Sequence, residues 1–91
     1  VMNMKIKDGF LLREVAGNYV VIAVGEDAVN FNSIITVNEI GAYIWNKINE
    51  GKNEEAIADD IIGEYSIDRD TALKDIGEFA NQLREAGIIE E

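Results

Sequence analysis

The chain contains neither cysteine nor histidine. Without these residues it can form no disulfide, has no thiolate nucleophile and no imidazole general base, and lacks the usual ligands of zinc and of iron–sulfur clusters. Much of enzyme chemistry is therefore excluded, and we expect no catalytic residue, no metal and no cofactor.

Long apolar runs are also absent. The longest uninterrupted one, Tyr19–Val24, has six residues, whereas a membrane-spanning helix needs about 18 or more. No apolar segment typical of a signal peptide stands near the first residue. We therefore expect a cytoplasmic protein without a membrane partner.

Basic residues are scarce. Eight lysines and arginines stand against 18 aspartates and glutamates, which gives a net charge of -10. Such a surface repels a phosphate backbone, so nucleic acid is not an expected partner.

The residues that are present predict a small α+β protein. With 91 residues, of which 47% are hydrophobic, the chain can build one modest core, and we expect a single domain. Strands are predicted at Phe10–Ala16 and Tyr19–Val24, joined by a turn at Gly17-Asn18. The second strand is apolar on both faces, as in the middle of a sheet. Met2–Lys7 reads either as a frayed arm or as an edge strand.

A third strand is predicted at Ser33–Val37, with Ile35 and Val37 on the core side. The segment before it contains Asp27, Asn30 and Asn32, but their spacing does not match a calcium-binding loop. We therefore interpret this segment as an ordinary connection between strands.

Three helices follow. Asn38 is a favoured N-cap for a helix over Glu39–Asn49, although Thr36 and Glu39 also have the spacing of a capping box. Asn53 caps the second helix. Either Asp68 or Asp70 caps the third, which continues to about Ala86.

The third helix has an unusually wide apolar face. Its small and apolar residues cover an arc of roughly 140° on a helical wheel, more than one core contact requires. These residues are Ala72, Leu73, Ile76, Phe79, Ala80, Leu83, Ala86 and Gly87. Part of this face therefore has room for another partner.

Pairs of carboxylates are the remaining candidates for catalysis. They occur at Glu54 and Glu55, at Asp59 and Asp60, and at Asp68 and Asp70. Helix capping and solubility explain these positions, and we interpret none of them as an active site.

Two binding functions are compatible with these elements. A DNA-binding winged helix would use the third helix for recognition, but acidic residues outnumber basic ones there: Arg69, Lys74 and Arg84 stand against Asp68, Asp70, Asp75, Glu78 and Glu85. The other function is peptide binding, in which an extended partner pairs with the edge of the third strand beside the apolar third helix. A domain that only docks to a partner protein is a further alternative.

The order of the motifs resembles the PqqD-like family, the stand-alone form of the RiPP recognition element. The similar segments are LREVAGNYVVIAVG, IITVNEIGAYIWNKINEG, NEEAIADDIIGEYSID and DIGEFANQLREAGII, between about Phe10 and Ile89. The most specific residues are Asn38, Gly41, Trp45, Gly51, Tyr65, Asp75, Phe79, Leu83, Gly87 and Ile88.

The resemblance implies a winged-helix-like fold of three antiparallel strands followed by three helices. It also implies a non-enzymatic chaperone that binds the leader region of a ribosomally synthesised precursor peptide by strand addition. Such a protein presents the leader to a modifying enzyme, often a radical SAM enzyme.

The resemblance further implies a set of site residues. The peptide would pair with the strand formed by Ser33, Ile34, Ile35, Thr36 and Val37. The wall of the cleft would consist of Leu73, Ile76, Phe79, Ala80 and Leu83, with Lys74 and Arg84 as partners for acidic leader residues. One departure is that many members carry a proline after the second strand, whereas this chain has none.

Overall fold

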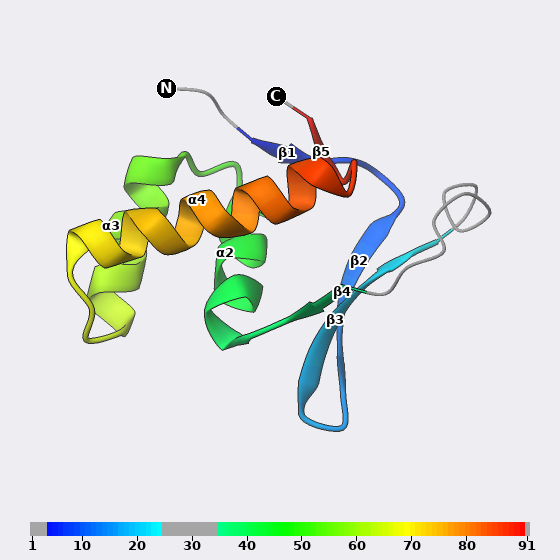
Figure 1. The fold of residues 1–91 in the computed structure, drawn as a ribbon, viewed down its shortest axis with the longest axis horizontal. Helices are drawn as coiled ribbons and strands as arrows, with labels where there is room; N and C mark the ends of the chain where they lie inside the picture. Colours follow the sequence, from blue (N-terminus) through cyan, green and yellow to red (C-terminus); the bar gives the residue numbers. More distant parts are fainter. Residues whose placement is uncertain (1–3, 25–34, 91) are drawn as a thin grey trace.

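The computed structural model describes residues 4–24 and 35–90. Ser33, Ile34 and the connecting segment with Asp27, Asn30 and Asn32 lie outside the described residues. Figure 1 shows a body of helices on one side, a β-hairpin that projects from it on the other, and the two ends of the described chain close together.

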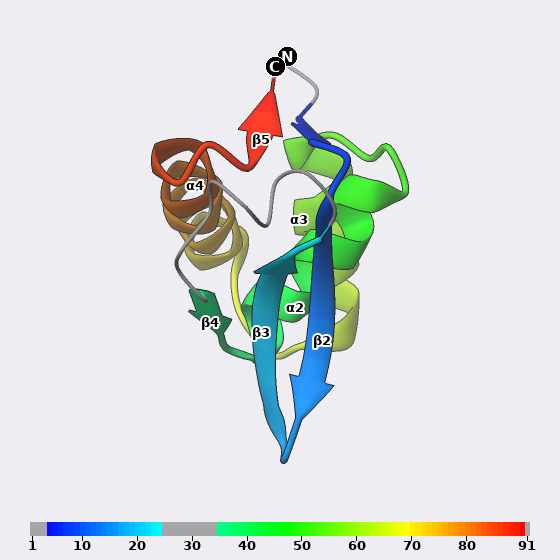
Figure 2. The same ribbon diagram turned by 90° about the vertical axis from the view of Figure 1, so that its right-hand side faces the viewer.

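The main sheet is antiparallel, with strand order β2-β3-β4. Its strands are β2 (Phe10–Val15), β3 (Asn18–Ala23) and β4 (Ile35–Val37). The prediction that the second strand is central is confirmed. β4 lies at the margin of the sheet on the same side as the C-terminal helix (Figure 2).

The hairpin turn lies one residue earlier than the sequence suggested. Val15 pairs with Asn18, so the turn residues are Ala16 and Gly17, both with positive φ (52° and 82°). Two residues with positive φ are typical of the type I′ turn that joins twisted strands. The side-chain pattern explains the register, because Leu12 opposite Val21 places apolar residues on the core face.

Alternation along the strands separates a core face from an outer face. Val21 is fully buried, whereas Leu11 and Val15 point outward with exposed fractions of 41% and 57%. In β4, Val37 is buried and Thr36 is exposed. The prediction that Ile35 and Val37 face the core is confirmed, since Ile35 packs against the buried cluster.

The helices are α2 (Glu39–Asn49), α3 (Glu54–Glu64) and α4 (Arg69–Glu85). Each begins after a side chain that accepts a hydrogen bond from a backbone N–H of the first turn. Asn38 accepts from Gly41 at 2.7 Å, Asn53 from Ala56 at 2.9 Å and Asp68 from Thr71 at 2.8 Å. These caps satisfy N–H groups that have no partner within the helix. The N-cap of α4 is therefore Asp68 and not Asp70, and the N-cap of α2 is Asn38 and not Thr36.

The ends of the chain meet in a second, two-stranded sheet. β1 (Lys5–Ile6) pairs with β5 (Ile89–Glu90), and Lys7 N donates a hydrogen bond to Ile88 O at 2.8 Å. The open question about Met2–Lys7 is thus answered for Lys5 and Ile6, which form a strand outside the main sheet. Ile88 and Ile89 fold back onto the core, where both are buried.

The core lies between the three helices and the inner face of the main sheet. Its largest fully buried side chains are Trp45, Ile44, Ile57, Ile61, Ile76, Leu83, Ile88 and Val21. The predicted fold class, an α+β winged-helix-like arrangement of three antiparallel strands followed by three helices, is confirmed. No helix in residues 4–24 and 35–90 has the length and apolar character needed to cross a membrane.

An ion pair holds the turn between α2 and α3 against α3. Lys52 Nζ donates to Asp60 Oδ2 at 2.6 Å, and Lys47 Nζ lies 3.8 Å from the same oxygen. The hydrogen bond from Lys52 lowers the pKa of Asp60 below its ordinary value, although desolvation opposes the shift.

We expect Asp60→Asn to remove a stabilisation that depends on pH. Because the folded state lowers this pKa, the stabilisation is present above the unfolded value of about 3.9 and is lost as the pH falls through the folded value. Urea unfolding should therefore show Asp60→Asn less stable than the wild type at pH 7, with the difference closing below about pH 4.

Asp8→Asn is the matched control, since Asp8 is exposed and makes no ion pair with the described part of the chain. It removes the same charge and should leave the pH dependence of stability unchanged. A difference between Asp60→Asn and wild type that stays constant with pH would contradict the assignment.

Candidate functional site

β4 is an edge strand within the described sheet, because its only neighbour there is β3. Along the free side of an antiparallel edge strand, alternate residues direct their N–H and C=O groups away from the sheet. These groups are able to complete a ladder with another extended chain.

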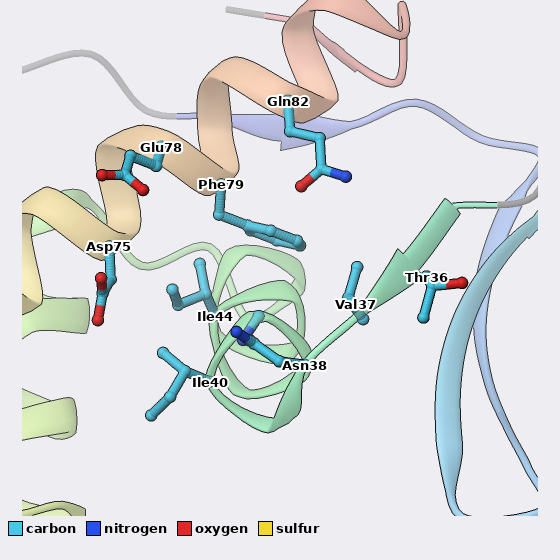
Figure 3. Close-up of a pocket in the computed structure, with 10 residues that line it drawn as sticks. Thr36, Val37, Asn38, Ile40, Ile44, Asp75, Glu78, Phe79 and Gln82 are labelled. Carbon is cyan, nitrogen blue, oxygen red and sulfur yellow. The ribbon is translucent and has the colours of Figure 1, made fainter.

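A pocket of about 380 Å³ opens beside this edge (Figure 3). On one side it is lined by Thr36, Val37, Asn38, Ile40, Gly41 and Ile44, from β4 and the start of α2. On the other side it is lined by Asp75, Glu78, Phe79 and Gln82 from α4. The pocket therefore joins the strand edge to one face of α4.

Helical spacing brings the four α4 residues to one face. Asp75 and Phe79 are one turn apart, as are Glu78 and Gln82. The face is apolar at its centre, where the Phe79 ring extends from α4 toward Val37, and polar around that centre (Figure 3).

Phe79 belongs to the core and to the pocket at once. It is only 7% exposed, and its ring lies against the first turn of α2. A Cβ atom at Gly41 would lie 3.2 Å from Phe79 Cε1 and 3.3 Å from Asn38 Oδ1. Glycine at this position therefore lets the ring and the cap of α2 lie close together.

The site residues expected from the sequence divide into four groups. Thr36, Val37 and Phe79 line the pocket, and Ile35 precedes Thr36 in β4. Ser33 and Ile34 are outside the described residues. The other apolar residues belong to the core: Ile76, Ala80 and Leu83 are almost completely buried, and Leu73 packs against the buried cluster. The basic residues form the fourth group.

The two expected basic residues do not line the pocket. Lys74 Nζ lies 3.9 Å from Glu78 Oε1, and both side chains are largely exposed. Arg84 donates a hydrogen bond to Asn81 Oδ1 at 2.8 Å. The charged residues that do line the pocket are acidic, Asp75 and Glu78.

The sequence analysis did not assign Asp75, Glu78 or Gln82 to the site. Spacing from Phe79 would have identified two of them, because Asp75 and Gln82 lie four and three positions away and share its face of the helix. Glu78 directly precedes Phe79, and its place is shown by the pocket lining. Four residues quoted for the family resemblance, Asn38, Gly41, Asp75 and Phe79, meet around the pocket.

The fold and the site define a class of protein, a winged-helix-like α+β protein with an open sheet edge beside an apolar helix face. The sequence matches the family described as coenzyme PQQ synthesis protein D (PqqD) over residues 11–89. The chain therefore belongs to the PqqD family, and the resemblance seen in the sequence is confirmed.

Solved structures of similar fold contain bound leader peptides. TbiB1, in complex with the TbiA(beta) leader peptide, is 28% identical, with a TM-score of 0.76 and 94% of each chain covered. Lasso peptide synthetase B1, complexed with the leader peptide, is 18% identical, with a TM-score of 0.79; 99% of this chain and 100% of that chain are covered. No curated protein gives a significant match.

The contact between Gly41 and Phe79 predicts opposite effects of two similar substitutions. Replacing glycine by alanine inside a helix ordinarily stabilises a protein by about 1 kcal/mol. Gly77→Ala should show this gain, because nothing lies within 4 Å of its new Cβ. Gly41→Ala should gain less or destabilise, because the new methyl group pushes against the Phe79 ring.

The free energies of unfolding of the two variants and the wild type, measured in urea, test this prediction. Ring resonances of Phe79 should also shift in Gly41→Ala and remain in place in Gly77→Ala. Equal stabilisation by both alanine substitutions would mean that the position of the Phe79 ring does not depend on the absence of a side chain at Gly41.

Proposed function

We propose that this protein binds the leader region of a ribosomally synthesised precursor peptide as an added strand against β4. The leader's side chains enter the pocket between β4 and α4. The protein has no catalytic role of its own and presents the bound peptide to a modifying enzyme. The family resemblance suggests a radical SAM enzyme as that partner. Residues 1–91 act as one peptide-recognition domain, with its core at about 10–89.

The single observation that carries this proposal is the pocket that joins the free edge of β4 to the Phe79 face of α4. A strand edge supplies backbone hydrogen bonds that do not depend on the partner's sequence, and a neighbouring pocket supplies selectivity for alternate side chains. Membership of the PqqD family and the leader complex of TbiB1 support the same conclusion.

Titration of the isotope-labelled protein with the leader of a precursor peptide encoded near its gene tests the proposal. We expect backbone amide shifts to concentrate at 35–37 and on the pocket-facing turns of α4. Shifts confined to α3, or none at micromolar leader, would contradict strand addition at β4. Retention of the protein on duplex DNA at moderate salt would instead favour a DNA-binding regulator.

Phe79→Leu should weaken leader binding about tenfold, because an aromatic anchor at the centre of an interface carries much of its binding energy. Leucine keeps the position apolar, so the helical circular dichroism should be retained. The matched control is Leu11→Ala, which trims an exposed apolar side chain of β2 far from the pocket. Equal losses in both variants would show that the pocket is not the binding site.

A further inference from the structure

We infer that the peptide bound at this site carries a lysine or arginine whose side chain crosses the pocket and ends between Asp75 and Glu78. The inference rests on the proposed function and adds the chemistry of the ligand to it. It differs from the expectation, implied by the family resemblance, that acidic leader residues meet Lys74 and Arg84.

The first step is the charge of the lining. Asp75 and Glu78 are the charged residues among the ten that line the pocket. Asp75 is half-buried, and its carboxylate has no hydrogen bond or ion pair with residues 4–24 or 35–90. A peptide that covers the pocket removes water from this carboxylate, which is unfavourable unless the peptide supplies a cation or a donor.

The second step is the distribution of polarity within the pocket. Val37, Ile40, Ile44 and Phe79 form the apolar part of the lining, whereas Asp75 and Glu78 lie on the side of Phe79 away from β4 (Figure 3). A side chain that starts from a strand beside β4 must cross the apolar part before it meets the carboxylates. Lysine and arginine match this order, since each has a long aliphatic stem and a charged end.

The aromatic ring strengthens the preference for a cation. The stem would lie along Phe79, and a guanidinium or ammonium group near the ring gains a further electrostatic attraction. A glutamate of similar length would instead place its charge beside two carboxylates of the same sign.

Neighbouring groups do not cancel this preference. Lys74 lies at 3.9 Å from Glu78, but both side chains are about two-thirds exposed or more, at 74% and 66%, and an exposed pair of this kind is weak. The N-terminus of α2 favours anions in principle. Here Asn38 already accepts the hydrogen bond of Gly41 N, and Glu39 supplies a negative charge in the first turn.

The experiment selects peptides from a pool of random 12-residue sequences displayed on phage, with the full chain as bait. Selected peptides are synthesised, and those that shift the backbone amide resonances of residues 35–37 are counted as bound at the pocket beside β4. Each is compared with an analogue in which its basic residue is glutamine. In the selected peptides we expect a lysine or arginine at a constant sequence distance from the peptide's own apolar residues. Each selected peptide should bind about fivefold more tightly than its glutamine analogue.

Two double variants locate the effect. The Asp75→Asn/Glu78→Gln variant should bind each selected peptide and its glutamine analogue with nearly equal affinity. Asp70→Asn/Glu85→Gln changes the net charge by the same amount on exposed positions of the same helix, outside the pocket lining, and should keep the fivefold preference. This double-mutant comparison isolates the coupling between the peptide's cation and the pocket.

The outcomes separate the inference from the proposed function. Peptides that shift 35–37 without a preference for a basic residue, or a preference that survives Asp75→Asn/Glu78→Gln, would overturn the inference and leave strand addition intact. Failure of every selected peptide to shift 35–37 would overturn both. So would a dimer of the free chain with β4 paired between copies.

Discussion

The structure depends on one close crossing, where Phe79 of α4 lies against Gly41 in the first turn of α2. The absence of a side chain at Gly41 lets the ring approach a turn that Asn38 has already capped. Because β4 runs directly into that turn, the crossing also fixes how far α4 stands from the sheet edge. The width of the pocket and the packing of the core are consequences of the same contact.

An open strand edge is a hazard as well as a binding site, since it can pair with the edge of another copy. β4 is short in the described part of the chain, and α4 stands over one side of it. The net charge of -10 adds long-range repulsion between copies. The acidity that repels a phosphate backbone therefore also repels other copies from the edge.

Local signals in the sequence predicted most of the fold. Each helix start depends on a cap within its own first turn, so Asn53 was predicted without tertiary information, and Asn38 and Asp68 were each one of two candidates. The pairing of β1 with β5 joins opposite ends of the chain, and no local pattern specifies such a contact. The hairpin turn lies one residue earlier than predicted, because pairing across the strands, and not turn composition alone, sets the register.

The site was harder to predict because an apolar arc on a helix does not show which part faces the core. Ile76 and Leu83 share the arc with Phe79, yet both are fully buried in the core while Phe79 reaches the pocket. The position of β4 relative to α4 decides between them. The same holds for charge: a count along α4 finds Lys74 and Arg84, but the charged residues that line the pocket are Asp75 and Glu78. The lining of the pocket therefore follows from the few side chains that one helix crossing directs into it, and the overall composition of the helix does not reveal which ones.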